Sequence, residues 1–133
     1  MRSRPYNRPM PDRGVILFAH GARDPRWSEP FERLAGRLSQ LAPDVAISLA
    51  FLEFMTPNLA DAARALVEDG CRTVTIVPVF LGVGGHVRRD VPALVERIAA
   101  EHPRVDVRVA GSVGDDDVVL DAIAGVCLSA ARA

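Results

Sequence analysis

Four short apolar runs recur along the chain and alternate with stretches of helical periodicity. The runs cover residues 14–19, 45–52, 73–81 and 105–110. They are rich in β-branched residues and largely continuous, which is typical of strands that are covered on both faces. The pattern predicts four strands of a parallel sheet.

Between these runs, apolar residues recur at the spacing of one helix face, i, i+3, i+4 and i+7. Thr56 followed by Pro57 predicts the N-cap and first residue of the second helix, and Gly70 predicts its end. Asp90 is the predicted N-cap of the third helix. The four predicted apolar faces lie within residues 31–41, 59–67, 91–98 and 119–127.

The strict alternation of strand and helix predicts an α/β fold. We expect a single three-layer domain over residues 14–133, with right-handed crossovers and the flavodoxin-like strand order 2-1-3-4. Residues 1–13, rich in Arg and Pro, are expected to form a flexible leader. In such sheets a ligand binds beyond the carboxyl ends of the strands, beside the first strand.

Composition excludes several classes of function. The net charge of −1 and the 5% aromatic content argue against a nucleic-acid partner. All 16 basic residues are Arg, so neither a Schiff-base lysine nor a phosphate-binding loop with its lysine is available. No apolar run approaches the ~20 residues needed to cross a bilayer. Cys71 and Cys127, far apart in the sequence, are interpreted as core residues of a cytoplasmic protein.

Three side chains with metal-binding and proton-accepting groups follow predicted strands. His20 follows the first strand, Glu53 the second, and His86 lies in the glycine-rich segment after the third. Two imidazoles and a carboxylate suit Fe²⁺, Co²⁺, Ni²⁺ or Zn²⁺, and the same groups accept protons near neutral pH. We therefore predict that His20, Glu53 and His86 are catalytic residues and metal ligands.

The residues around the two histidines suit a large acidic ligand. Glycines permit close approach to the backbone and expose N–H groups. Arginines at the same places can bind carboxylates with two hydrogen bonds. The predicted substrate-binding residues are Arg23, Gly82, Gly84, Gly85, Arg88 and Arg89.

Three segments carry a resemblance to a known family: GVILFAHGARDPRW, FLEFMTPNL and VTIVPVFLGVGGHVRRDVP. With the intervening helices, about residues 14–128 resemble the short, single-unit sirohydrochlorin chelatases of the CbiX type, in the class II chelatase superfamily. The family's two histidines match His20 and His86, and its intervening glutamate matches Glu53. Ala22 stands where the family often has Ser, at the cost of one hydroxyl.

The resemblance implies the insertion of Co²⁺, Fe²⁺ or Ni²⁺ into sirohydrochlorin, a tetrapyrrole intermediate of cobalamin and sirohaem biosynthesis. It also implies a homodimer, and a reaction that needs no nucleotide or redox cofactor. Two alternatives stay open at this point. A metal or tetrapyrrole carrier can share the same fold. A histidine phosphatase is weaker, because Ala19 precedes His20 and Gly21 where those enzymes have Arg.

Other polar residues are interpreted as structural. Asp24, ahead of Pro25, is a predicted helix N-cap, and residues 115–117 form an acidic run favoured by a helix dipole. His102 is expected to be a solvated residue near a helix end. Trp27 is interpreted either as a contact for a macrocycle or as a scaffold residue.

Overall fold

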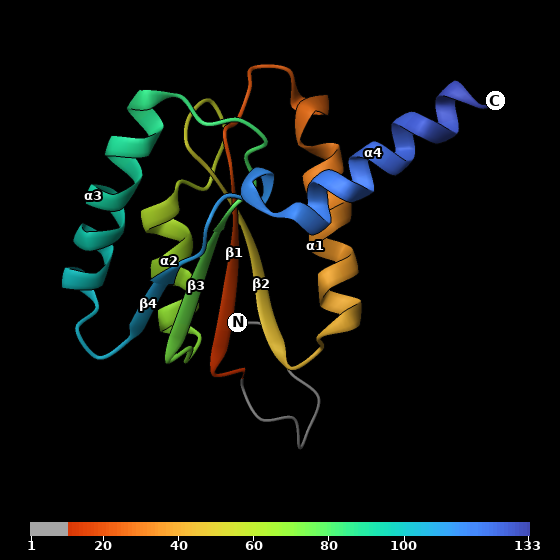
Figure 1. Ribbon diagram of the computed structural model, residues 1–133. Coiled ribbons are helices and arrows are strands. Elements are labelled where there is room, and N and C mark those ends of the chain that lie inside the picture. Colours follow the sequence, from red (N-terminus) through yellow and green to blue (C-terminus); the bar gives the residue numbers. More distant parts are fainter. Residues whose placement is uncertain (1–10) are drawn as a thin grey trace.

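The computed structural model describes residues 11–133, and strands and helices alternate along them (Figure 1). Residues 1–10, most of the predicted leader, lie outside the described residues. The elements are β1 (Arg13–Ala19), η1 (Pro25–Ser28), α1 (Glu29–Leu41), β2 (Val45–Phe51), α2 (Leu59–Glu68), β3 (Thr73–Pro78), α3 (Gly85–Glu101), β4 (Asp106–Val109), η2 (Val113–Asp115) and α4 (Asp117–Ala131).

The four strands form one parallel sheet in the order β2-β1-β3-β4, which confirms the predicted topology. Ala19 at the end of β1 pairs with Phe51 at the end of β2, and Phe18 pairs with Pro78 of β3. The central strand β1 and its two neighbours therefore end at the same edge, at the top of Figure 1. This edge is where the fold rule places a ligand.

Helices cover both faces of the sheet, in three layers. The main core lies between the sheet and the pair α2 and α3, where Ile16, Phe18 and Ile76 are fully buried. Helix α1 packs on the opposite face, against β1 and β2. Cys71 is buried in the main core, as expected.

The starts of two helices differ from the prediction. Helix α2 is capped by Asn58, whose side chain accepts a hydrogen bond from the Asp61 N–H, so Thr56 and Pro57 lie outside the helix. Helix α3 begins at Gly85, with its N-cap at Gly84, so Asp90 lies inside it. The predicted start of the third helix, at Asp90, is wrong because the apolar face of α3 continues one turn further towards the N-terminus, through Val87.

Other helix ends agree with the prediction. Asp24 caps η1 and Asp116 caps α4, each through a backbone N–H. Gly70 follows α2 with a φ of +105°. His102 is the C-cap of α3, but it is half-buried and its Nε2 is buried, so the expectation of a solvated side chain is wrong.

Helix α4 departs from the expected packing. The predicted inward face, residues 119–127, is exposed apart from the half-buried Val119, and Cys127 is exposed rather than in the core. Figure 1 shows α4 running past α1 and away from the sheet. The spacing of its apolar residues correctly predicted a helix, but within residues 11–133 nothing buries the predicted face.

Within residues 11–133, the backbone is already bonded to the domain just before β1. The backbone carbonyl of Asp12 accepts hydrogen bonds from the N–H groups of Arg72 and Thr73, at 2.7 and 3.1 Å. Strand β1 starts at Arg13, one residue before the predicted strand.

Within residues 11–133, no helix is both long and apolar enough to span a bilayer.

Candidate functional site

His20 and Glu53 are held together by the ends of β1 and β2. The strand pairing continues past both strands: the Leu52 N–H donates to the Ala19 carbonyl at 2.9 Å, and the Glu53 N–H to the His20 carbonyl at 3.1 Å. The side chains meet directly, with 2.8 Å between His20 Nε2 and Glu53 Oε1. Each is about half exposed, at 48% and 49%, so the pair is open to a ligand.

Gly21 makes this close approach possible. Its φ is +91°, and a Cβ at this position would lie 1.9 Å from the Glu53 carbonyl oxygen. Only glycine fits both the backbone angle and the contact. The sequence analysis did not single out Gly21, although its place directly after a histidine at a strand end was an available signal.

Aromatic and apolar side chains surround the pair. The ring of Phe80 meets the His20 ring edge to face, with 6.5 Å between centroids. Phe54, next to Glu53, is 58% exposed and has a φ of +64°. The guanidinium of Arg23 lies over the Phe54 ring, 5.0 Å from its centroid. An exposed aromatic residue in a sparsely populated backbone conformation is typical of functional sites.

A pocket of about 250 Å³ adjoins the pair on the side of β4. Phe80 forms part of its wall and also contacts His20, so the pocket and the pair share a boundary. Arg88 from α3 and Asp115 from η2 supply charged groups to the lining. Of the predicted carboxylate-binding residues, Arg88 lines this pocket.

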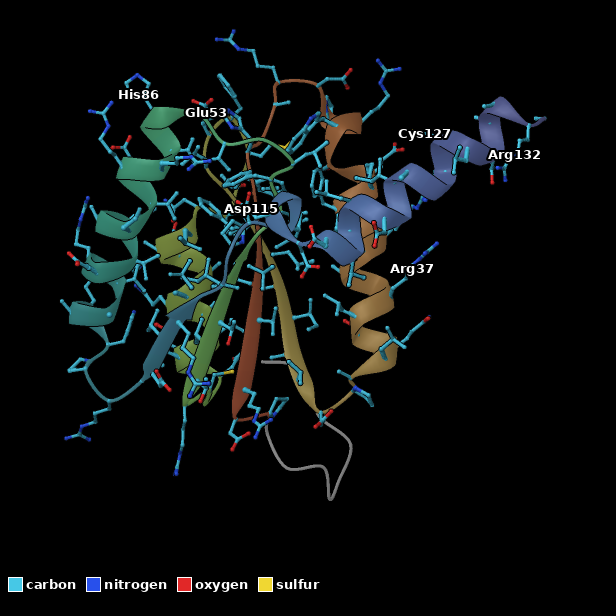
Figure 2. All side chains as sticks on the ribbon, in the orientation of Figure 1. Arg37, Glu53, His86, Asp115, Cys127 and Arg132 are labelled. Atoms are coloured by element: carbon cyan, nitrogen blue, oxygen red, sulfur yellow. The ribbon has the colours of Figure 1, made fainter. Side chains whose placement is uncertain are left out.

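His86 lies apart from the other two predicted ligands. It is exposed in the first turn of α3, where Figure 2 shows it at the same end of the molecule as Glu53. Within residues 11–133, no three His, Cys, Asp or Glu side chains are grouped closely enough to hold a metal ion. One chain therefore brings together two of the three predicted ligands, and the roles of all three stay predictions.

The glycine-rich segment leads into α3. Gly82, Gly84 and Gly85 are exposed, and a Cβ at any of the three would meet no atom within 4 Å. Neither packing nor backbone angle requires glycine there. Arg89, like Arg88, is exposed in the first turns of α3.

Two residues beside His20 belong to the scaffold. Asp24 accepts hydrogen bonds from the Arg26 side chain, the shortest 2.8 Å, and from its N–H at 2.9 Å. These bonds, the side-chain ones first, lower the pKa of the Asp24 carboxyl below its ordinary 3.8. The ring of Trp27 packs on Phe31, with centroids 4.6 Å apart, which favours the scaffold interpretation.

Comparison with known proteins decides the family. The CbiX family model matches residues 14–127. The chain belongs to the CbiX family. A sirohydrochlorin cobaltochelatase of Sulfurisphaera tokodaii is 28% identical over 108 residues, 81% of this chain and 85% of that protein. The enzyme of the same name from Saccharolobus solfataricus is 29% identical over 112 residues, 80% of this chain and 86% of that protein. The predicted family is thus confirmed.

Solved structures agree with this CbiX assignment. A cobalamin (vitamin B12) biosynthesis CbiX protein from Marinobacter aquaeolei is 37% identical, with a TM-score of 0.79 over 90% of this chain and 98% of that one. The sirohydrochlorin chelatase SirB of Bacillus subtilis subspecies spizizenii, solved with cobalt, is 20% identical with a TM-score of 0.70. It matches 80% of this chain but 45% of its own length, so this CbiX chain has the fold of one half of SirB.

Proposed function

We propose that this chain catalyses the insertion of a divalent metal ion into sirohydrochlorin at the His20–Glu53 pair. Its CbiX membership and the names of its relatives support the reaction. The observation that carries the proposal is the 2.8 Å contact between the two side chains at the carboxyl ends of β1 and β2. A general base and a metal-binding carboxylate are thereby paired where the fold presents ligands.

Metal insertion requires proton transfer and ligand exchange. The inner nitrogens of the tetrapyrrole lose two protons while the metal ion exchanges its water ligands for those nitrogens. His20 accepts a proton, and Glu53 orients the imidazole and stabilises its charged form. Because imidazole and carboxylate also suit Co²⁺, Fe²⁺ and Ni²⁺, the pair can hold the incoming ion before transfer.

The start of α3 is the proposed carboxylate-binding segment. Its N-cap, Gly84, provides no side-chain cap, so the first backbone N–H groups are available to an anion. Arg88 and Arg89 follow within the first two turns, and His86 is the remaining proposed metal ligand or base. The glycines at 82, 84 and 85, which packing does not require, leave space for a flat ring.

Two exposed apolar side chains are proposed contacts for the macrocycle. Phe54 follows Glu53, and Leu81, 64% exposed, follows Phe80. A face of a large ring buries apolar surface against such side chains. The sequence analysis did not identify either residue, although both lie just beyond strand ends.

One chain does not enclose this substrate. The pocket beside His20 holds about 250 Å³, below the usual range for sites that take even drug-sized ligands. A second copy of the chain completes the cavity in this proposal, with C₂ symmetry as the commonest arrangement.

The proposed reaction uses no nucleotide or redox cofactor. The two cysteines, one in the core and one on α4, fit a reducing cytoplasm.

The test follows metal insertion into sirohydrochlorin by absorption spectroscopy under anaerobic conditions, with Co²⁺, Fe²⁺ and Ni²⁺ in parallel. We expect Co²⁺ to be inserted, because the named relatives are cobaltochelatases. His20→Ala and Glu53→Gln should each lower kcat by about 10²–10⁴-fold, the usual contribution of a positioned acid–base group. His86→Ala tests the third predicted residue in the same assay.

The matched control is Glu68→Gln, the same substitution at an exposed residue that ends α2. It should leave the rate unchanged. Wild-type rates in both His20→Ala and Glu53→Gln would refute the role of the pair. Stoichiometric binding of metal or tetrapyrrole without turnover by the wild-type protein would replace the enzyme with a carrier.

A further inference from the structure

Arg23 and Phe54 form a second contact between the two loops that carry the His20–Glu53 pair. Arg23 lies three residues after His20, and Phe54 directly follows Glu53. The guanidinium carbon of Arg23 lies over the Phe54 ring, 5.0 Å from its centroid. The loops after β1 and β2 therefore meet twice, once through the pair and once through a cation and an aromatic ring.

The loop after β2 holds Phe54 out from the domain. The Phe51 N–H donates to the Pro57 carbonyl at 2.9 Å, which closes the loop at its base. Within the loop, the Met55 N–H donates to the Glu53 carbonyl at 2.8 Å. Phe54 lies between these two residues with a φ of +64°, and it is 58% exposed. Bulky residues rarely adopt this angle.

Stability alone does not explain the contact between Arg23 and Phe54. Both residues are exposed, so their contact removes little surface from water. For stability, a residue that adopts positive φ easily, such as Gly or Asn, suits position 54 better than Phe does. An exposed aromatic ring held in a sparsely populated conformation is instead typical of a ligand-binding site.

The guanidinium of Arg23 has a contact for its charge but no acceptor for its N–H groups. Among residues 11–133, no carboxylate or carbonyl accepts a hydrogen bond from it. Arg26 differs, since its guanidinium donates to the Asp24 carboxylate at 2.8 Å. A guanidinium has five N–H donors, and the attraction of its charge to a ring face needs none of them. Arg23 therefore keeps its donors for an acidic ligand.

We propose that Phe54 positions Arg23 to bind one carboxylate group of the macrocycle beside the His20–Glu53 pair. The inference rests on the proposed function, because it names a recognition site for the same acidic substrate. The start of α3 follows β3, whereas Arg23 and Phe54 follow β1 and β2. Two separate carboxylate contacts fix the rotation of a flat ring over the pair as well as its position.

The charge of Arg23 and its contact with Phe54 each favour binding. The carboxylate of Glu53 repels an acidic ring, and a guanidinium carried by the adjoining loop offsets that repulsion. An exposed arginine normally loses side-chain entropy when it binds a ligand. Contact with Phe54 already restricts the conformations of Arg23, so less entropy is lost on binding. Phe54 is thus a positioning residue in this proposal.

The first experiment measures the dissociation constant of metal-free sirohydrochlorin by absorption titration of the full chain. Arg23→Gln should raise this constant about tenfold, the scale of one hydrogen bond to a charged group. In the metal-insertion assay the loss should appear mainly in kcat/KM and less in kcat, as for a contact that substrate and transition state share.

The matched control is Arg26→Gln, which removes the same charge from a position three residues away. The Arg26 guanidinium is already paired with Asp24, so the dissociation constant should stay within about twofold of the wild-type value. Circular dichroism confirms that each variant is folded.

The second experiment tests whether Phe54 acts through Arg23. Phe54→Leu keeps an apolar side chain and removes the ring that Arg23 contacts. In that background, Arg23→Gln should raise the dissociation constant by about threefold or less, because an arginine without its ring is already misplaced. Phe54→Tyr keeps the ring and should bind as the wild type does, since position 54 is open to water and accepts a hydroxyl.

Each outcome supports or overturns the inference. An unchanged dissociation constant in Arg23→Gln overturns it. An effect of Arg23→Gln that persists in full in the Phe54→Leu background also overturns it, because the two side chains then act independently. Binding with the expected pattern among the variants, but without metal insertion by the wild type, keeps the inference and refutes the proposed reaction. A wild-type chain that does not bind sirohydrochlorin overturns both.

Discussion

Gly21 shows how one residue sets the geometry of the site. We predict that Gly21→Ala destabilises the fold by at least about 2 kcal/mol, since the left-handed backbone alone costs about 1–2 kcal/mol for an L-residue. The contact of 1.9 Å with the Glu53 carbonyl adds to this. Displacement of Glu53 should also separate it from His20 and lower the rate of metal insertion. Urea unfolding and the chelatase assay measure the two effects.

The control is Gly36→Ala in α1, where a Cβ meets no atom within 4 Å. A helix-interior glycine replaced by alanine should stabilise the protein by about 0.5–1 kcal/mol. Equal effects of the two substitutions on unfolding would contradict the assignment of strain and contact to position 21.

Asp24 gives a residue-level prediction about pH. Hydrogen bonds from Arg26 lower its pKa from the ordinary 3.8. The folded pKa is thus below the unfolded one, so the stabilisation is fully present above the ordinary carboxyl range and is lost as pH falls through the lowered value. A ¹³C NMR titration should place the midpoint of the Asp24 carboxyl below 3.8.

Arg26→Ala removes the side-chain hydrogen bonds, which are the larger cause, and keeps the backbone one. The midpoint should move up towards the ordinary value without reaching it. A midpoint that does not move would show that Arg26 is not the cause.

The sequence predicted at which strand ends the candidate site lies, but it did not predict which of the site's side chains are in contact. Strand order places His20 and Glu53 on adjacent strand ends, and the structure confirms that they meet. Their contact also needs the register of β1 on β2 and the φ of Gly21, which composition and periodicity do not contain. His86 lies several residues beyond β3, so the path of the intervening loop, and not strand order, determines its position.

At the scale of elements, the N-cap of α2 is a direct test of the corrected boundary. Asn58 accepts the Asp61 N–H at 2.8 Å, whereas Thr56 lies outside the helix. We predict that Asn58→Ala costs about 1 kcal/mol of the free energy of unfolding. Thr56→Ala should change it by less than about 0.5 kcal/mol, as surface substitutions usually do.

Guanidinium unfolding followed by circular dichroism measures both variants. A larger loss for Thr56→Ala than for Asn58→Ala would restore the boundary expected from the sequence. The original expectation rested on Thr followed by Pro, a common start signal. The structure begins the helix two residues after Pro57, where Asn58 accepts an N–H three residues ahead.

Periodicity identified all four main helices, but it placed the start of α3 too late, put the exposed Leu34 and Leu41 on the inner face of α1, and did not show what covers α4. The face predicted within residues 119–127 is apolar, as a buried helix requires. The same pattern results whether the covering surface comes from the same chain or from another. The destination of α4 depends on how η2 packs on the segment after β3, a contact between residues distant in sequence.

At the scale of the whole molecule, the dimer of the proposed function couples folding to association. An isolated chain leaves the apolar side chains of α4 in water, so a second copy that covers them stabilises its native state. The melting temperature should therefore rise with protein concentration. Each tenfold dilution removes about 1.4 kcal/mol of stability, so a hundredfold dilution should lower Tm by about 5 °C.

Scanning calorimetry at high concentration and fluorescence-detected melting at low concentration measure this shift. Trp27, packed on Phe31 at the start of α1, is a natural reporter of the fold. Ile123→Glu should melt lower than the wild type and at the same temperature at every concentration, because it no longer gains from association. A wild-type Tm that is independent of concentration would mean that one chain folds without its partner, and the exposed α4 would then need a different cover.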